Sequence, residues 1–326
     1  MAKSYNTKLT ELLGMKYPIF AGGMQWVSKA EFVAKICNTG ALGFITAESY
    51  DTPEDLRQAL KRMPTLTDNP FGVNLSMLPE LGMPERTLRF CEVICEEGVK
   101  VVETAGRSPE ALIPKFKEAG VKIIHKLTSV RHAKTAERLG VDAVTLIGYG
   151  SGGHIGMDDV ANFIMIPEAV KTLNIPVVVG GGITTGAGFL AALAMGAEAV
   201  LLGTPFFVCE ESPIHPAFKE SIVNARTTDT TLIMRSIRNP LRCLRNKLSD
   251  ECIELEENGA TLEEIVGKLA GGKGKLAYDS GDIDISPIAC GQVVGLIDEI
   301  KSAEKIVSTI ISEADLLLER LNRMST

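Results

Sequence analysis

The 326-residue sequence predicts an α/β fold, a (β/α)₈ TIM barrel with a C-terminal helical insertion or lid. Eight short apolar runs recur at intervals of about 20 to 35 residues, and amphipathic helical patterns lie between them. The runs are almost continuously apolar, which is typical of strands buried on both faces of a parallel sheet. Eight such units favour a closed barrel, and an open doubly wound sheet is the alternative that the same periodicity allows.

The expected strands cover residues 17–21, 41–46, 71–77, 99–104, 121–127, 142–146, 176–180 and 197–202. The expected helices cover residues 29–37, 53–62, 85–95, 109–119, 130–139, 167–172 and 185–194. Several helices follow a residue that commonly caps a helix N-terminus, such as Ser129, and several end at a glycine, such as Gly140. These signals delimit the units independently of the apolar pattern.

The pattern changes after Thr204. Residues 213–270 have mainly helical periodicity with many charges, and the glycine-rich stretch 271–275 resembles a flexible link. Residues 286–300 and 302–322 are both expected to be helical and to pack back on the barrel.

We therefore expect two domains. Residues 1–204 and 286–326 would form the barrel, which would hold the cofactor. Residues 205–285 would form a mainly helical lid or insertion.

The bulk composition limits the class of function. Hydrophobic residues make up 45% of the chain, which is enough for a large core. The net charge of -7 and the absence of a dominant basic stripe argue against binding to nucleic acid. Seven scattered cysteines without metal-type spacing predict free thiols, no metal site and a reducing cytoplasmic location. The sequence has neither an apolar signal core nor an apolar run of about 20 residues, so no membrane span is expected.

A glycine-rich loop follows the sixth expected strand and reads Ile147-Gly148-Tyr149-Gly150-Ser151-Gly152-Gly153-His154-Ile155-Gly156. So many glycines exclude a regular element and let the backbone approach a ligand closely. His154 is the imidazole of this loop, and its ordinary pKa suits proton transfer near neutral pH. His154 is therefore the predicted catalytic residue, and a glycine-rich turn with a surface histidine is the alternative.

A barrel binds its ligand at the carboxyl ends of its strands. Gly180, Gly181 and Gly182 follow the seventh strand, and Gly203 and Thr204 follow the eighth. Barrels commonly hold a phosphate at this place, where backbone N–H groups and a helix start suit an anion. The alternative is a tight turn into the next helix.

The other strand ends suit a planar ring. Gly22-Gly23-Met24 can bring bare backbone up to the ring, and Asn74 can both donate to and accept from ring amide groups. Lys126 could stabilise negative charge at the pyrimidine edge of a reduced flavin, or it could instead form an ion pair with Glu103. His125 must point away from Lys126 along the strand and is expected to be a packed residue. One phosphate site and one ring site, without a G-x-G-x-x-G motif, indicate FMN.

Five motifs resemble the nitronate monooxygenase-like (2-nitropropane dioxygenase-like) flavoprotein superfamily, which includes FMN-dependent enoyl-acyl-carrier-protein reductases. They are Gly22-Gly23-Met24-Gln25-Trp26, Pro70-Phe71-Gly72-Val73-Asn74, Gly152-Gly153-His154, Gly180-Gly181-Gly182 and Gly203-Thr204. Further stretches are similar to the NADH:quinone reductase branch, among them Val101-Val102-Glu103-Thr104-Ala105-Gly106, Leu232-Ile233-Met234-Arg235-Ser236 and Gly291-Gln292-Val293-Val294-Gly295-Leu296-Ile297-Asp298. The resemblance covers almost the whole chain.

The resemblance implies a barrel in which FMN is reduced by NADH or NADPH and reoxidised by a small-molecule acceptor. The implied cofactor-binding residues are Gly22, Gly23, Met24, Gln25, Asn74, Lys126, Gly152, Gly153, Gly180, Gly181, Gly182, Gly203 and Thr204. Two positions depart from the family pattern. Gly150 stands where the family usually has an acidic residue, which would affect how His154 is held. Pro205 replaces a frequent arginine, which would remove a phosphate or lid contact.

The leading functional hypothesis is transfer of hydride from NADH or NADPH through flavin N5 to a quinone. His154 would orient the acceptor or supply a proton, and the loop around Met77-Leu78-Pro79 would gate the site. Alternatives are an enoyl-thioester reductase, a nitronate monooxygenase and a flavin-binding protein without turnover. A homodimer is among the expected assemblies.

Overall fold

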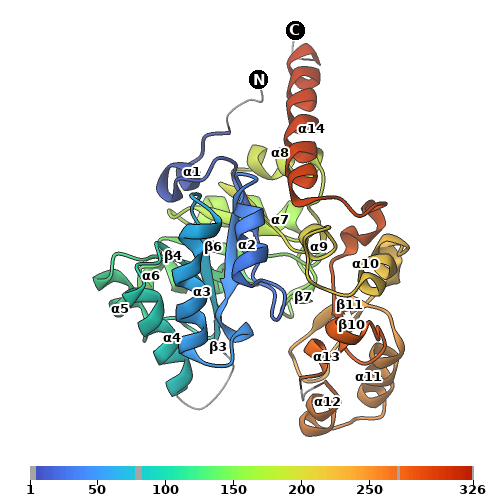
Figure 1. Cartoon of the computed structure of the whole chain (residues 1–326). Coiled ribbons are helices and arrows are strands. Elements are labelled where there is room, and N and C mark those ends of the chain that lie inside the picture. The colour runs from blue at the N-terminus through green and yellow to red at the C-terminus, as the bar shows by residue number, and fades with distance from the viewer. Residues whose placement is uncertain (1–4, 78–82, 270–271, 325–326) are drawn as a thin grey trace.

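The computed structural model describes residues 5–77, 83–269 and 272–324, so Leu78 and Pro79 of the predicted gating loop lie outside the described residues. A closed parallel barrel with strand order β1-β2-β3-β4-β5-β6-β8-β9 forms its centre (Figure 1). The barrel strands are β1 (Ile19–Ala21), β2 (Leu42–Thr46), β3 (Gly72–Met77), β4 (Val101–Gly106), β5 (Lys122–Leu127), β6 (Ala143–Ile147), β8 (Val177–Gly180) and β9 (Ala199–Leu202). The predicted (β/α)₈ fold is confirmed, and each strand coincides with an apolar run.

Helices surround the barrel (Figure 1). They are α1 (Lys8–Leu13), α2 (Ala30–Cys37), α3 (Pro53–Leu66), α4 (Glu85–Glu96), α5 (Ile113–Glu118), α6 (Val130–Leu139), α7 (Asn162–Thr172) and α8 (Gly186–Ala194). Three expected boundaries were wrong. The helix expected at 53–62 continues to Leu66, with Pro64 inside it. Residues 109–112 precede α5 rather than opening it, and α7 starts before Pro167, which lies inside the helix at the cost of one backbone donor.

The expected capping residues explain where several helices begin and end. The Ser129 hydroxyl accepts from the backbone N–H of His132, and α6 ends at Gly140, whose φ is 91°. Thr52 forms a capping box with Asp55 at the start of α3. Each cap satisfies backbone groups that the helix itself leaves unpaired.

The long helix α14 (Ala303–Met324) packs against α8, and its C-terminal half extends beyond the barrel (Figure 1). A Cβ atom on Gly186 would lie 2.4 Å from Cβ of Glu313, so the two helices approach closely because this position is glycine. Glu313 also accepts the backbone N–H of Gly186 at 2.7 Å. The helix predicted at 302–322 is thus confirmed, as is its packing on the barrel.

A second, antiparallel sheet was not predicted. It comprises β10 (Thr230–Ile233), β11 (Leu241–Leu244), β12 (Ile288–Ala289) and β7 (Gly153–His154). The helix expected at 286–300 is wrong, because this segment contains β12 and the short 3₁₀ helix η3 (Gln292–Leu296). These strands have no strong pattern of their own and form by pairing with distant segments, such as Leu241 opposite His154.

The remaining elements form the lid and its connections. They are α9 (Thr204–Phe207), α10 (Pro216–Val223), η2 (Thr227–Asp229), α11 (Lys247–Glu257), α12 (Leu262–Leu269) and α13 (Lys273–Ser280). A further 3₁₀ helix, η1 (Ala47–Ser49), directly follows β2 of the barrel instead. The expected link at 271–275 is helical from Lys273 onward, and Gly271 lies outside the described residues. The lid has its own apolar cluster, but its sheet recruits β12 from the segment beyond residue 285, so the domain division remains a prediction.

The barrel interior explains which side chains reach the site. Because side chains alternate along a strand, Leu42, Phe44 and Thr46 of β2 all point inward. Apolar side chains such as Phe20 and Phe44, whose rings meet edge to face at 5.4 Å, fill the part of the interior nearer the amino ends of the strands. The part nearer the carboxyl ends is polar. None of the helices in the described ranges has the length and apolarity that a membrane span requires.

Candidate functional site at the barrel mouth

Three polar side chains are joined inside the carboxyl end of the barrel. Asn74 and Glu103 are register partners on β3 and β4, and Asn74 Nδ2 donates to Glu103 Oε2 at 2.8 Å. Lys126 on β5 donates from Nζ to the same oxygen at 2.7 Å. Glu103 is completely buried. Lys126 therefore does form the ion pair weighed as the alternative to a flavin contact, and it still lies at the predicted ligand face.

Several buried polar atoms around this cluster lack hydrogen-bond partners in the described part of the chain. They include Thr46 Oγ1, Glu103 Oε1 and Thr145 Oγ1, which belong to β2, β4 and β6. A buried polar group without a partner costs about 1–3 kcal/mol, so such groups are usually satisfied by water or by a ligand. A ligand ring with donors and acceptors along one edge matches this layer.

The β1–α2 turn closes one side of the mouth. A Cβ atom on Gly23 would lie 2.5 Å from Cβ of Asn74, so only a glycine lets the backbone pass this close to the amide. Gly22 is buried against Leu201, Met24 is half-buried, and Gln25 is exposed. The structure thus brings Gly23 to the cluster and Gly22 next to Leu201, while Gln25 is exposed.

Glycine turns follow β8 and β9 on the opposite side. Gly181 and Gly182 have φ values of 96° and 76°, which a residue with a side chain rarely adopts. The Ser151 hydroxyl, buried and without a partner among the described residues, lies where a Cβ atom on Gly181 would be. Thr204 Oγ1 accepts the backbone N–H of Gly291 at 3.0 Å, which leaves its own O–H free to donate. These donors fit a phosphate group beside the start of α8.

The glycine-rich loop is fixed to this cradle by its backbone. Gly148 donates to the carbonyl oxygen of Gly180 at 3.1 Å, and the Asn162 side chain donates to the carbonyl oxygens of Gly180 and Gly181. A Cβ atom on Gly152 would lie 2.5 Å from the backbone of Cys290, so this glycine allows the loop to pack on residue 290. The expectation that the loop contains no regular element was wrong, because Gly153 and His154 pair with β11.

His154 is held by this pairing and by hydrogen bonds to Asn239. Its side chain has an exposed surface, yet the protein around it lowers its pKa below the ordinary value, mainly by desolvation. A lowered pKa means that the imidazole is neutral at pH 7. The residue can therefore donate one hydrogen bond and accept another without carrying charge.

The lid is attached to the mouth at three places. Arg235 forms a two-point ion pair with Asp159, with N–O distances of 3.0 and 2.5 Å. The Arg242 guanidinium lies 4.7 Å from the centre of the Tyr149 ring and donates to the Tyr149 carbonyl oxygen at 3.2 Å. Lys275 lies 5.8 Å from the centre of the Trp26 ring. The lid therefore contacts both the glycine-rich loop and the β1–α2 turn.

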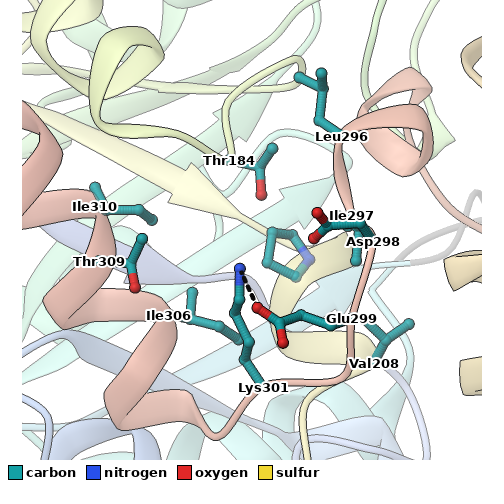
Figure 2. A pocket seen from close by; sticks show the side chains of 11 residues that line it. Thr184, Val208, Leu296, Ile297, Asp298, Glu299, Lys301, Ile306, Thr309 and Ile310 are labelled. Carbon is teal, nitrogen blue, oxygen red and sulfur yellow. Dashed lines mark ion pairs between the residues drawn. The ribbon is translucent and has the colours of Figure 1, made fainter.

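Gly150 and Pro205, the two residues that depart from the family pattern, have different surroundings in the structure. A Cβ atom on Gly150 would lie 3.4 Å from Gln292 Oε1, so Gln292 occupies the space next to this position. Pro205 lines a cavity of about 50 Å³ between α9, α14 and the segment 296–301. In Figure 2, Lys301 reaches into this cavity and pairs with Glu299, at an N–O distance of 3.1 Å. A cavity this small holds a few water molecules and cannot hold a flavin ring.

His125 lies on the outer face of the barrel wall, as predicted. It is 3% exposed and its Nδ1 is 2.9 Å from Thr104 Oγ1. Burial lowers its pKa from 6.5 to about 4. His132 is exposed beside the Ser129 cap, and His215 caps α10, so the other two histidines lie away from the mouth.

We predict that His125 makes the fold sensitive to acid. The unfolded chain binds this proton below pH 6.5, whereas the folded chain does so only near pH 4, so stability falls as the pH is lowered through this window. The cost should reach about 3 kcal/mol near pH 4. His125→Asn should lack this part of the loss in urea unfolding, while His132→Asn should keep it. Equal pH slopes for wild type and His125→Asn would contradict the assignment.

Some site residues were not found from the sequence. Ser151 lies among the glycines of the loop after β6, and Arg242 lies in the segment 213–270, which was expected to be mainly helical. Glu48 was missed because the end of the second strand was not considered, although it follows β2 by two residues. Among the described residues, no group of three or more His, Cys, Asp or Glu side chains could hold a metal ion.

Comparisons with known proteins cover nearly the entire chain. The family model described as nitronate monooxygenase matches residues 6–313. The structure of FabK from Thermotoga maritima is similar with a TM-score of 0.89 and 36% sequence identity, over 98% of this chain and 100% of that chain. A nitroalkane oxidase from Streptomyces ansochromogenes gives a TM-score of 0.81 at 25% identity, over 96% and 99% of the two chains.

A curated relative comes from Rhodococcus jostii (strain RHA1). It is named (3aS,4S,5R,7aS)-5-hydroxy-7a-methyl-1-oxo-octahydro-1H-indene-4-carboxyl-CoA dehydrogenase. It is 30% identical over 354 aligned residues, which cover 98% of each chain. The similarity therefore extends over the barrel and the lid together.

Proposed function

The chain belongs to the nitronate monooxygenase family of oxidoreductases, and we propose that it uses FMN to pass a hydride from NADH or NADPH to a quinone. The observation that carries this proposal is the arrangement of the barrel mouth. A buried polar layer with unsatisfied atoms at Thr46, Glu103 and Thr145 faces a glycine cradle after β8 and β9. A ring with polar edges and a single phosphate matches both halves.

We assign the ends of the cofactor to different residues. Gly181, Gly182 and Thr204 would hold the phosphate with two backbone N–H groups and a hydroxyl. Gly23 and Asn74 would receive the ring, with Lys126 at its polar edge. FMN, when bound, supplies two-electron hydride transfer between the nicotinamide and the acceptor. The protein positions the two partners and controls water and protons.

His154 would position the acceptor through hydrogen bonds. Because its pKa is lowered, the imidazole is neutral. A neutral imidazole is a weak acid, but it is a suitable hydrogen-bond donor to a carbonyl oxygen. A quinone requires only such a hydrogen bond, because water can protonate its oxygens later. This property of His154 favours a quinone over an acceptor that must be protonated on carbon.

An enoyl or other acyl thioester is the second candidate acceptor. It is supported by the 36% identity to FabK and by the Rhodococcus jostii relative, whose name specifies a carboxyl-CoA substrate. With such a substrate, hydride would go to the β-carbon and His154 would protonate or orient the α-carbon. The same mouth would then have to admit a long thioester arm beside the lid.

Denaturation of the purified protein is expected to release FMN, because the mouth has one phosphate cradle and no dinucleotide motif. Mass spectrometry of the released cofactor tests this expectation. The test variant is Gly181→Ala, which would place a Cβ atom 2.0 Å from Ser151 Oγ and should lose the cofactor, and its matched control is Gly98→Ala. Gly98→Ala, at a helix end with φ of 67° and open space, should be strained but keep FMN. Release of FAD, or of no flavin, would overturn the proposal.

A further inference from the structure

Glu48 lies next to the barrel mouth and takes no part in the proposed binding of FMN or of the acceptor. It belongs to η1, which directly follows β2, and its Oε1 accepts the backbone N–H of Ser76 at 2.8 Å. Its Oε2 is buried and has no hydrogen-bond partner within the described ranges. Two cations act on this carboxyl group, Lys126 from β5 and Arg86 from α4.

A chain of hydrogen bonds connects this carboxyl group to the site. Ser76 Oγ donates to Asn74 Oδ1 at 3.2 Å, and Asn74 Nδ2 donates to Glu103 Oε2, which also accepts from Lys126. Glu103 already offsets the charge of Lys126, so the buried part of the mouth contains two carboxyl groups for one lysine, and the second cation, Arg86, is exposed and donates to the carbonyl oxygen of Tyr50. The net charge at the mouth therefore depends on whether Glu48 carries a proton.

We propose that Glu48 is a proton-binding group of this site, which takes up one proton from solvent when the bound flavin is reduced. The proposal rests on the function proposed above. Two-electron reduction of a flavin with uptake of one proton leaves one added negative charge in the mouth. That charge favours the neutral form of a nearby carboxyl group, so Glu48 binds the second proton and restores the original net charge.

The surroundings of Glu48 support this role. Burial raises its pKa from 4.5 to about 7, against the opposing effects of the Ser76 amide, Arg86 and Lys126. The strand β3, which packs on η1, contributes the Ser76 amide and has no ionisable side chain. Glu103 of β4 is paired with Lys126. A carboxyl group with this pKa responds to one added charge by changing its protonation at neutral pH.

Potentiometric titration of the flavin at several pH values tests the proposal. Above pH 7, wild type should take up two protons per two electrons, and Glu48→Gln should take up one. A tenfold change in the equilibrium constant of a two-electron couple corresponds to about 30 mV. The reduction potential should therefore fall by about 60 mV per pH unit in wild type and by about 30 mV per pH unit in Glu48→Gln. Asp51→Asn removes an exposed carboxyl group nearby and should keep the wild-type slope.

Equal slopes in wild type and Glu48→Gln would overturn the proposal while leaving the flavin function intact. A protein that binds no flavin would instead contradict the proposed function. In that case, titration of the glutamate carboxyl signals of flavin-free wild type by NMR should still show one group near pH 7. Infrared difference spectra of wild type should show a carboxylic acid forming upon reduction, and its absence would also overturn the proposal, even if Glu48→Gln did not fold.

Discussion

His154→Ala is expected to retain FMN and to slow the reoxidation of the flavin by about 10²–10⁴-fold for an acceptor that His154 must protonate, the usual range for the loss of an acid–base group. The side chain is fixed at the mouth by the pairing of β7 with β11 and by Asn239. A quinone should lose less than an enoyl thioester, because water can replace a proton donor to oxygen more easily than one to carbon.

Stopped-flow measurement of the two half-reactions separates these effects. Reduction of the flavin by NADH should change little in His154→Ala unless the imidazole also contacts the nicotinamide. His132→Ala is the control, since His132 is an exposed residue beside the α6 cap. If both half-reactions of His154→Ala match those of wild type, then His154 only packs the loop.

Lys126→Met is expected to reduce the free energy of unfolding by about 3–5 kcal/mol, because it leaves the buried carboxylate of Glu103 without its cation. The ion pair has an N–O distance of 2.7 Å, and the Glu103 side chain has no exposed surface. The variant should also bind FMN more weakly or lower its reduction potential, since a cation near the developing negative charge is lost.

A double variant separates the two roles of Lys126. Lys126→Met with Glu103→Gln removes both charges and should recover most of the lost stability in urea unfolding. It should not recover the flavin affinity or potential if Lys126 contacts the cofactor. Unchanged stability, affinity and potential in Lys126→Met would show that neither the ion pair nor the cofactor contact matters.

The barrel could be predicted because its local signals agree with its tertiary structure. Each strand is an apolar run, and caps such as Ser129 and Gly140 mark helix ends. The antiparallel sheet could not be predicted in this way. Its strands are two to four residues long, and their pairing joins segments as distant as residues 153–154 and 241–242. Such pairings depend on the folded barrel and leave little trace in local periodicity.

The site followed from one rule, that barrel ligands lie at the carboxyl ends of the strands. Applied to β3, β5, β8 and β9, the rule identified Asn74, Lys126 and the two glycine turns. It left open whether Lys126 faces a flavin or pairs with Glu103, and the distance of 2.7 Å between the two side chains shows that the ion pair forms. The same rule also applies to Glu48, because Glu48 follows the carboxyl end of β2.

Gly152 illustrates a limit of reading glycines as ligand contacts. The sequence suggested that it makes room for the cofactor. In the structure, the space where its side chain would be is filled by the backbone of Cys290. A glycine that permits one backbone to pass another has the same appearance in a sequence as one that faces a ligand.

Anaerobic stopped-flow spectroscopy tests the central claim most directly. The flavin is first bleached with NADH or NADPH and then mixed with benzoquinone, a crotonyl thioester or a nitronate. We expect rapid bleaching by one of the nicotinamides, followed by reoxidation that is fastest with benzoquinone. The absence of bleaching, or faster reoxidation by the thioester or the nitronate, would contradict the proposed quinone reductase.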